Sequence, residues 1–320
     1  MKQNLLGNTG IAVSELCQGT LPIGPLQADF PVEKAAEVIR YGLEAGITFI
    51  DTAQRYDTYP HVRRALQGYS GRVVISSKSW APSYDLMNEA IEQARRELDR
   101  DVVDIFLLHA ARAGAKVFEE RKGALECLCE AKSKGRIRAV GMSTHSAKAV
   151  RLAADVPEID VIHPLINMTG LGILDGTLED MRASIEYAAG KGKGIYLMKI
   201  MAGGHLVDRY QHAIDFARTV SGVSSFAVGM LSKAEIDANI AYLEGREIST
   251  ELKAQVGKAK KQTTIMDQCK GCGECEKFCP NEAIHVVDGR AAVDPERCLL
   301  CGYCVPHCPG FQIRLINKED

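Results

Sequence analysis

The stretch CKGCGECEKFCP, residues 269–280, decides the fold of the C-terminal part of the chain, and its pattern recurs as CLLCGYCVPHCP at residues 298–309. Both copies read C-x-x-C-x-x-C-x-x-x-C-P, and together they hold eight of the 11 cysteines. Three thiolates two residues apart wrap a tight loop around one metal cluster, whereas the fourth cysteine points away from that loop. The spacing therefore predicts a small domain built around metal clusters.

The double run resembles the bacterial-type ferredoxins that carry two [4Fe-4S] clusters. In those proteins the fourth cysteine of each run ligates the other cluster, so the resemblance implies a crossed assignment. Zinc is the alternative, because C-x-x-C pairs also form tetrahedral sites with four thiolates. The third cysteine and the Cys-Pro that ends each run argue against zinc. The expected ligands are Cys269, Cys272, Cys275 and Cys308 for cluster 1, and Cys298, Cys301, Cys304 and Cys279 for cluster 2.

The composition is that of an ordinary soluble globular protein, since the 320 residues are 46% hydrophobic and 25% charged. The segment Met1–Gly7 lacks the apolar core of a signal peptide, and no stretch approaches the ~18 apolar residues of a membrane span. We therefore expect a cytoplasmic protein, whose cysteines stay reduced and free to bind metal. A formal net charge of -2 gives no reason to expect a nucleic acid or a membrane as partner.

Upstream of about residue 245, short apolar runs alternate with segments of helical period. Strict alternation of strand and helix predicts parallel strands joined by crossover helices. Eight such units match the length of a (β/α)8, or TIM, barrel. A doubly wound open sheet is the alternative, but no G-x-G-x-x-G follows the first run. The expected strands are Leu16–Thr20, Ile47–Ala53, Val73–Ser79, Val103–Ala110, Ile137–Thr144, Val161–Met168, Ile195–Met201 and Ser224–Met230.

Polar side chains stand at the ends of strands two to four, where a barrel of this kind keeps its active site. They are Asp51, Tyr56, Lys78 and His109. A phenol has a pKa near ~10 and is a poor acid at neutral pH unless a cation lowers that value. We expect Lys78 to lower the pKa of Tyr56, and Asp51 to hold Lys78. Trp80 is expected to pack the barrel and not to form a wall of the substrate pocket.

These residues carry a resemblance to the aldo-keto reductases over residues 1–260. Asp51 and Tyr56 lie in a D-T-A-x-x-Y stretch, Lys78 precedes a Ser-Trp pair, and His109 ends a D-x-x-L-L-H stretch. The resemblance implies that Tyr56 protonates a substrate carbonyl oxygen as a hydride arrives from a nicotinamide, and that His109 orients the carbonyl. The implied function is reduction of a carbonyl compound, or the reverse oxidation of an alcohol.

The same resemblance implies NADP(H) as cofactor, with NAD(H) as the alternative. The sequence departs from the family where Thr144 and His163 replace amide side chains, Met198 replaces an aromatic ring, and Leu231 replaces an arginine. Ser232 begins an S-x-x-E capping box, which would expose a helix N-terminus to a phosphate. The expected cofactor contacts are Thr20, Asp51, Ser143, Thr144, His163, Met198, Ser232, Lys233 and Asn239.

Two domains are predicted, a barrel at residues 1–260 and an α+β dicluster domain at 265–316. The barrel is expected to end in an extra helix with an apolar edge at Leu252, Val256 and Ala259. That helix would climb back along the barrel wall. In aldo-keto reductases the C-terminal tail covers the substrate pocket, so we expect the dicluster domain to lie near the mouth of the barrel.

The two halves pose a problem of electron count. Hydride transfer moves two electrons at once, whereas each [4Fe-4S] cluster passes one, and no flavin motif is present to join them. The clusters could organise a lid, receive a ferredoxin or flavodoxin partner, or sense oxygen beside a nicotinamide-dependent reductase. They could instead feed single electrons to a substrate held by the barrel. A third hypothesis is an electron carrier whose barrel is only a docking body.

Overall fold

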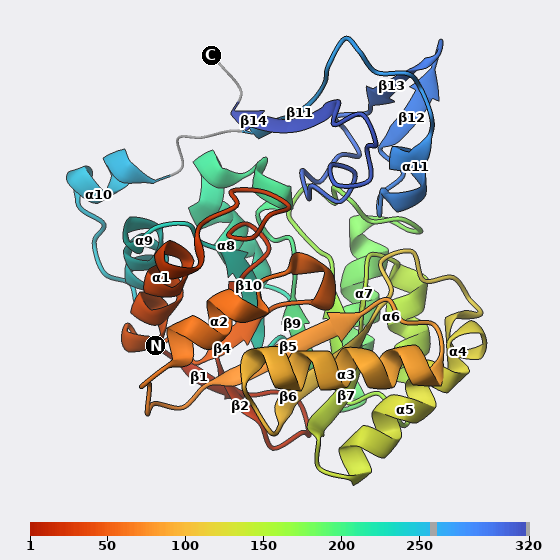
Figure 1. Ribbon diagram of the computed structural model, residues 1–320. Coiled ribbons are helices and arrows are strands. Elements are labelled where there is room, and N and C mark those ends of the chain that lie inside the picture. The colour runs from red at the N-terminus through yellow and green to blue at the C-terminus, as the bar shows by residue number, and fades with distance from the viewer. Residues whose placement is uncertain (257–260, 318–320) are drawn as a thin grey trace.

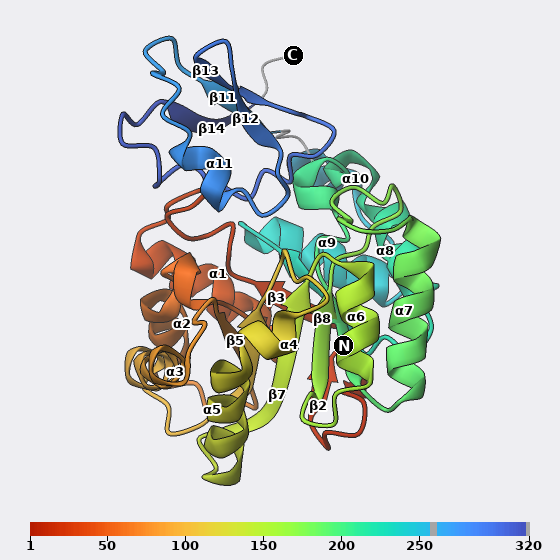
Figure 2. The ribbon, with the colours of Figure 1, turned by 90° about the vertical axis from the view of Figure 1, so that its right-hand side faces the viewer.

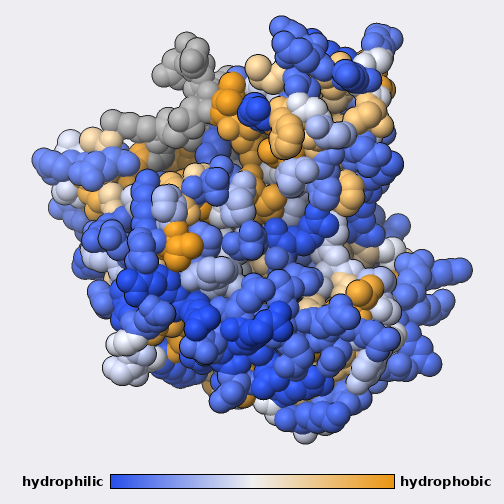
Figure 3. All heavy atoms as spheres, in the orientation of Figure 1, coloured by the Kyte–Doolittle hydropathy of each residue, from blue (hydrophilic) through white to orange (hydrophobic). Residues whose placement is uncertain are grey.

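The structure is a computed structural model that describes residues 1–256 and 261–317. It has two parts, a barrel surrounded by helices and a smaller body of short strands and loops at one end of that barrel (Figure 1). Hydrophilic side chains cover most of the helical face seen in Figure 3. Within the described ranges, every helix is too short or too polar to cross a membrane.

Eight parallel strands close into the barrel, and each lies within one of the eight predicted runs except that β9 begins one residue early. The predicted (β/α)8 fold is therefore confirmed. Closure comes from the last strand, which pairs in parallel with the first. Three strands end one residue sooner than predicted, and three end at least two residues sooner, at Asp51, Pro164 and Leu197, because the chain turns there into the loops of the barrel mouth. The strands are β3 (Leu16–Gly19), β4 (Phe49–Asp51), β5 (Val74–Ser79), β6 (Val103–His109), β7 (Ile137–Thr144), β8 (Val161–Pro164), β9 (Gly194–Leu197) and β10 (Ser225–Gly229).

Helices cover the outside of the barrel, each with its apolar side turned inward. In the third helix, for example, Ala90, Ala94 and Leu98 are buried on one face. The helices are α1 (Val32–Glu44), α2 (Tyr59–Leu66), α3 (Tyr84–Leu98), α4 (Val117–Glu120), α5 (Lys122–Ser133), α6 (Ala147–Ala154), α7 (Leu178–Gly190), α8 (Tyr210–Arg218) and α9 (Lys233–Leu243), with 3-10 turns η1 (Gln54–Tyr56), η2 (Ala202–Gly204) and η3 (Val207–Arg209).

An antiparallel hairpin of β1 (Gln3–Leu5) and β2 (Ala12–Ser14) precedes the barrel. Leu6 and Ile11, from the turn of this hairpin, pack inside the barrel against Phe49 and Leu107. The hairpin therefore fills the end of the barrel away from the mouth, and the interior is a packed core rather than a channel.

The cluster domain, which we define as residues 261–317, contains two short antiparallel sheets. β11 (Lys261–Ile265) pairs with β14 (Ile313–Asn317), and β12 (Ile284–Val287) pairs with β13 (Arg290–Val293). α11 (Glu274–Phe278) lies between β11 and β12 in sequence. The first sheet begins at Lys261, four residues before the predicted start of the domain. The core of the cluster domain is small, and cysteines form much of it.

The predicted extra helix is present but short. α10 (Thr250–Gln255) begins after Ser249, whose hydroxyl accepts a hydrogen bond from the backbone of Leu252. Leu252 and Val256 pack against Ala238 and Ile248, as their spacing predicts. The third residue of the predicted apolar edge, Ala259, lies outside the described residues.

The cluster domain lies over the carboxyl ends of the barrel strands, as expected for a lid (Figure 2). Barrel side chains contact its backbone and several of its side chains by hydrogen bonds. Among them are those from Arg112 Nη2 to Cys279 O, from His205 Nε2 to Cys298 O at 2.9 Å, from Gln27 Nε2 to Leu300 O at 3.2 Å, and between His145 Nδ1 and Asn281 Oδ1 at 2.7 Å. The segments that carry the cluster cysteines therefore face the mouth of the barrel.

Candidate active site

Four polar side chains meet at the mouth of the barrel. Asp51 ends β4, Tyr56 ends η1, Lys78 lies in β5 and His109 ends β6. Neighbouring parallel strands end at one rim, so residues far apart in sequence converge there. All four side chains are buried. The structure thus brings together the four residues predicted as catalytic, which we call the tetrad.

Lys78 and Asp51 form an ion pair in the interior of the rim. Lys78 Nζ donates to Asp51 Oδ1 at 2.8 Å and to Oδ2 at 2.7 Å, and also to Thr52 O at 2.9 Å. Tyr196 donates its hydroxyl to Asp51 Oδ1 at 3.0 Å. Buried charges are tolerated when each has an opposite partner and further hydrogen bonds. Asp51 therefore fixes the ammonium group of Lys78, which lies 4.9 Å from the centre of the Tyr56 ring.

The phenol of Tyr56 keeps its proton at neutral pH. Burial raises the pKa of Tyr56 well above its usual value, and Tyr303 and Asp51 raise it further. The lowering expected from Lys78 is not found, because Asp51 offsets the lysine charge and burial disfavours the phenolate. Tyr56 is therefore protonated at neutral pH, which is the form that a proton donor must have.

His109 stands beside Tyr56, with ring centres 6.2 Å apart in an edge-to-face arrangement. Burial, followed by the charge of Lys78, lowers the pKa of His109 well below its usual value. The imidazole is therefore neutral. Its Nδ1 is buried without a hydrogen-bond partner in the described part of the protein. An unsatisfied buried nitrogen is costly, so His109 has hydrogen-bonding capacity left for a ligand.

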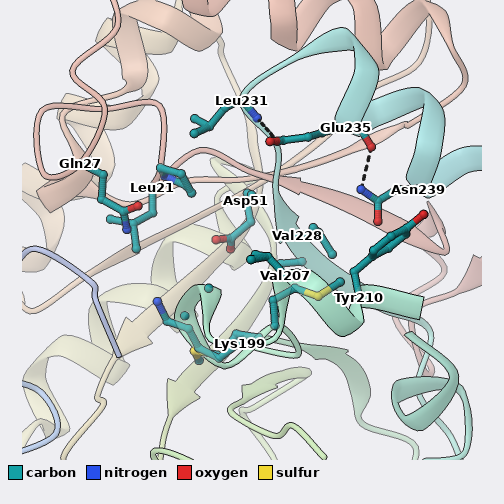
Figure 4. Close-up of a pocket in the computed structure, with 18 of the residues that line it drawn as sticks. Leu21, Gln27, Asp51, Lys199, Val207, Tyr210, Val228, Leu231, Glu235 and Asn239 are labelled. Carbon is teal, nitrogen blue, oxygen red and sulfur yellow. Dashed lines mark hydrogen bonds between the residues drawn. The ribbon is translucent and has the colours of Figure 1, made fainter. Parts of the chain in front are cut away.

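A cavity of about 360 Å³ opens from the tetrad toward α9. In Figure 4, Asp51 marks the inner end, with Lys199 on one side of it and with Glu235 and Asn239 on the other side, at the far end. Tyr56 also lines the cavity. We call this cavity the groove. Of the predicted cofactor contacts, four line it, namely Asp51, His163, Met198 and Asn239.

The other predicted cofactor contacts have partners elsewhere or lie outside the lining that the described residues form. Thr20 Oγ1 donates to Asp51 O at 3.1 Å, and Thr144 Oγ1 accepts from the backbone of Ser146 at 3.1 Å. Lys233 Nζ lies over the ring of Tyr41. Ser143 is the exception, because its hydroxyl is buried without a partner.

His163 stands where the aldo-keto reductase pattern has an amide side chain, and two contacts fix the orientation of its ring. Its Nδ1 contacts Tyr196 O at 2.7 Å, and its ring stacks on the Tyr196 ring with 3.8 Å between centres. Burial lowers the pKa of His163 to about 4, so it is neutral. A carbonyl can only accept, so Nδ1 carries the proton and Nε2, 3.7 Å from Asp51 Oδ1, is an acceptor.

At the far end of the groove, the N-terminus of α9 is already occupied. The hydroxyl of Ser232 accepts from Glu235 N at 3.2 Å, and the Glu235 carboxylate accepts from Leu231 N at 2.6 Å. Burial raises the pKa of Glu235. Only half of the capping box predicted from the sequence forms, because the Glu235 carboxylate accepts from Leu231 N and not from the backbone of Ser232. Both contacts use backbone groups that a phosphate would need.

Two lysines of the groove are absent from the sequence predictions. Lys199 is partly buried and has a positive φ of 61°, which a non-glycine residue adopts only at a cost. Its surroundings include Cys301, Lys78 and Asp51. Lys261 belongs to β11 of the cluster domain and lines the far end of the groove near Glu235. Only the docking of the two domains brings Lys261 there, so sequence spacing carries no signal for it.

The groove has hydrogen-bonding groups at both ends that could hold a nicotinamide nucleotide. Nε2 of His163 can accept at the inner end, and Asn239 Oδ1 lies at the far end, buried without a partner in the described part of the chain. Lys261 also lines the far end, where it donates to Gln27 Oε1 at 3.4 Å, and it offers a cation in place of the arginine that Leu231 replaces. Residues predicted to hold the phosphate, Ser232 and Lys233, are engaged in other contacts.

Four of the cluster cysteines, those expected for cluster 2, lie around one cavity. A small cavity is lined by Cys279 of the first run together with Cys298, Cys301 and Cys304 of the second. Four thiols around one cavity fit the [4Fe-4S] cluster expected there. Backbone N–H groups approach three cysteine sulfurs, a common environment for cluster ligands: Ala283 N to Cys279 at 3.1 Å, Gln312 N to Cys308 at 3.2 Å and Ala291 N to Cys269 at 3.4 Å.

A second cavity, of about 270 Å³, lies between the barrel and the cluster domain. Trp80 and His109 line it on the barrel side, and Phe278 and Pro280 line it on the other. Trp80 therefore borders a cavity next to the tetrad, and it also packs against the apolar cluster that contains Tyr56. Its Nε1 is buried without a partner in the described structure.

Comparison with known proteins agrees with this geometry. Residues 15–221 match the family model described as "Aldo/keto reductase family", so the chain belongs to the aldo/keto reductase family and is an oxidoreductase. Residues 263–309 match the model described as "4Fe-4S dicluster domain". The chain is thus an aldo/keto reductase barrel fused to an iron–sulfur domain of ferredoxin type.

Among individual proteins, the chain is similar to "Methylglyoxal reductase YeaE" of Escherichia coli K12, with 33% identity over 149 residues that cover 45% of this chain and 50% of the relative. It is 22% identical over 280 residues to "L-galactose dehydrogenase" of Arabidopsis thaliana, covering 74% and 86%. The match with YeaE, like that with YqkF of Bacillus subtilis, spans about half the length of the relative. A crystal structure of a putative aldo-keto reductase from Pseudomonas aeruginosa has a TM-score of 0.65 and 25% identity, covering 75% of this chain and 93% of that one.

Proposed function

We propose that the protein reduces a small carbonyl compound with NAD(P)H, and that Tyr56 donates the proton to the carbonyl oxygen. One observation carries the proposal, namely the buried Asp51–Lys78 pair beneath Tyr56, with neutral His109 beside it. The high pKa of Tyr56, raised first by burial, keeps a proton on the phenol. His109 can donate one hydrogen bond to orient the same carbonyl.

NAD(P)H, when bound, supplies the hydride. We assign its nicotinamide end to the inner groove, where His163 and Met198 lie beside Asp51. Asn239 and Lys261 would hold the rest of the nucleotide at the far end. The domain limits that we propose are a barrel ending near residue 256 and a cluster domain beginning at Lys261, because β11 belongs to a sheet with β14.

The test is reduction of methylglyoxal, chosen because a relative is named for it, by the cluster-loaded protein under anaerobic conditions with NADPH or NADH. Tyr56→Phe removes the proton donor and keeps the ring, so kcat/KM should fall by about 10²- to 10⁴-fold. Tyr187→Phe is the matched control, because Tyr187 contacts Asp155 on the exposed surface. Unchanged activity in Tyr56→Phe would exclude Tyr56 as the proton donor and with it the proposal.

A second candidate is favoured by the place of Cys301, which packs with Tyr56 and Tyr303 in one cluster of side chains. The clusters, when present, supply single electrons, and reduction of a carbonyl to an alcohol takes two electrons and two protons. A ferredoxin or flavodoxin would then be the external donor, and the groove would need no nicotinamide. Tyr56 would still donate a proton.

Anaerobic titration with NADPH and NADH separates the two candidates. If the nicotinamide proposal holds and the clusters are not coupled to it, NADPH binds and the cluster absorbance and electron paramagnetic resonance spectra stay unchanged. Absence of nucleotide binding, together with carbonyl reduction driven by reduced ferredoxin, would favour the second candidate. Bleaching of the clusters by NADPH would contradict the claim that the two cofactors are uncoupled.

A further inference from the structure

Tyr303 belongs to the cluster domain, but its side chain lies in the active site of the barrel. Its side chain is only 5% exposed and packs in one apolar cluster with Tyr56. The centre of its ring lies 6.4 Å from that of Tyr56, 5.5 Å from that of Trp80 and 6.2 Å from that of His109. One aromatic ring of the second domain therefore contacts two members of the tetrad.

The polar end of Tyr303 interacts with the catalytic phenol. The two rings lie 6.4 Å apart between centres. Burial is the largest cause of the high pKa of Tyr56, and a hydrogen bond with the neutral phenol of Tyr303 adds to it. A substrate oxygen must accept a hydrogen bond from Tyr56 before it can take the proton. Tyr303 and the substrate therefore compete for the same hydroxyl group.

The ring of Tyr303 also lies between two spaces. Tyr56 borders the groove, whereas Trp80 and His109 border the second cavity. Tyr303 lines neither cavity, but its ring packs near all three residues, so we place it between the groove and the cavity beneath the cluster domain. That cavity, at about 270 Å³, has room for a small organic molecule.

Close backbone packing keeps Tyr303 in place. The preceding Gly302 has a φ of 81°, and a Cβ there would lie 2.0 Å from Leu26 O. Gln27 holds the carbonyl of Leu300 at 3.2 Å. Arg55 covers the outer side, with its guanidinium 4.2 Å from the centre of the Trp80 ring and 5.9 Å from that of Tyr303.

We propose that Tyr303 is a specificity-determining residue of the reductase site, because its phenol holds the place beside Tyr56 that a substrate carbonyl takes and its ring admits only small carbonyl compounds. This inference rests on the proposed function, since it requires Tyr56 to be the proton donor. A substrate oxygen replaces the Tyr303 hydroxyl at Tyr56, and the remainder of the molecule fits between the ring of Tyr303, Trp80 and His109. Carbonyl compounds with a bulky substituent clash with that ring.

Two substitutions separate the steric effect from the hydrogen-bonding effect. Tyr303→Ala removes the ring, so kcat/KM for a bulky ketone such as acetophenone should rise at least tenfold relative to kcat/KM for propanal. Tyr303→Phe keeps the ring and removes the competing hydroxyl, so KM for propanal should fall by about 2- to 10-fold, as expected for one hydrogen bond. Its kcat should stay close to that of the parent protein. A purely structural role predicts no fall in KM.

Three controls accompany the assay with cluster-loaded protein. Tyr187→Phe should change neither KM nor the ratio of the two substrates. Cluster absorbance reports whether the cysteines are still occupied. Fluorescence of Trp80, the one tryptophan of the chain, reports whether Tyr303→Phe keeps the packing of the parent protein. If Tyr303→Ala releases the cluster domain, the KM of Tyr303→Phe alone decides between the proposed role of Tyr303 and a purely structural one.

The outcomes distinguish this inference from the function on which it rests. Activity that survives Tyr56→Phe overturns the proposed function and the inference with it. Loss of activity in Tyr56→Phe, combined with an unchanged KM in Tyr303→Phe, overturns the inference alone. A lower KM in Tyr303→Phe supports it, and a gain for acetophenone in Tyr303→Ala supports its steric part.

Discussion

The barrel and the cluster domain have cores of different chemistry. The barrel buries aliphatic and aromatic side chains from every strand and helix around it, in a layer outside the strands and a second layer within them. The described core of the cluster domain has few such residues, namely Ala283, Ile284, Ala291 and Ile313, and cysteines supply most of the rest. A domain of that size rarely folds on apolar burial alone. The barrel should therefore keep its fold without metal, and the cluster domain should not.

Removal of iron tests this difference most strongly. Anaerobic chelation should unfold residues 261–317 and leave the barrel folded, because metal binding and folding are coupled in small metal domains. Limited proteolysis should then cut within the cluster domain, while the far-ultraviolet circular dichroism of the barrel is kept. A cluster domain that still resists protease after complete loss of iron would contradict the claim that this domain needs metal to fold.

Inside the barrel, the largest effect is expected at the ion pair of the tetrad. Lys78→Met leaves Asp51 buried without its partner and should lower the free energy of unfolding by about 3–5 kcal/mol. Urea denaturation of the barrel gives that value. Arg64→Met is the matched control, because Arg64 pairs with Glu33 at 2.8 Å on the exposed surface, and its loss should cost less than about 1 kcal/mol. Equal losses of unfolding free energy in the two variants would show that burial does not make the Asp51–Lys78 pair more important for stability than an exposed pair.

Acid should weaken the barrel and its contact with the cluster domain together. Burial lowers the pKa of His163 to about 4 and that of His145 to about 3, whereas histidine in an unfolded chain titrates near ~6.5. Below about pH 6.5 the unfolded state therefore binds more protons, and the free energy of unfolding falls as the pH falls. His163 should contribute about 3 kcal/mol of loss by pH 4.

Urea denaturation at several pH values checks this slope. His163→Gln should flatten it, since the substituted side chain does not titrate. His145 contacts Asn281 of the cluster domain, so its protonation should also loosen the docking of the two domains. Stability that is constant between pH 6.5 and 4 would contradict the burial of both histidines.

The smallest effect is expected where one side chain joins the domains. His205 donates to Cys298 O at 2.9 Å, and His205→Ala should cost about 1 kcal/mol. Proteolysis of the holoprotein should show slightly faster cutting of the cluster domain, with the barrel unaffected. Faster cutting of the barrel instead would show that this contact stabilises the barrel and not the cluster domain.

Much of the fold is predictable from local patterns. The eight strands follow from apolar runs, and the cysteine runs follow from spacing, because each depends on residues close in sequence. The tetrad was also predictable, since Asp51, Lys78 and His109 end or lie near the ends of strands that must meet at one rim. The lengths of β8 and β9 were overestimated, because apolar residues continue into buried loops of the mouth.

Contacts that depend on docking were not predictable. Tyr303 looks like a spacer between two cluster cysteines, and its place beside Tyr56 follows only from how the cluster domain sits on the mouth. Lys199 stands at a strand end, yet its burial among Asp51 and Cys301 depends on the same docking. The pKa of Tyr56 was expected to fall because Lys78 is near, but the sequence could not show that burial outweighs that charge.

The order of strands in the barrel has a consequence for synthesis. Closure needs only β10, which pairs with β3, and the backbone N-terminus of Met1 meets Glu244 at 2.9 Å just after α9. All of these residues leave the ribosome before Cys269, the first cysteine of the two runs. Domains generally fold as they emerge. The nascent barrel can therefore offer a finished surface on which the iron-loaded segment settles, so the active site is completed last.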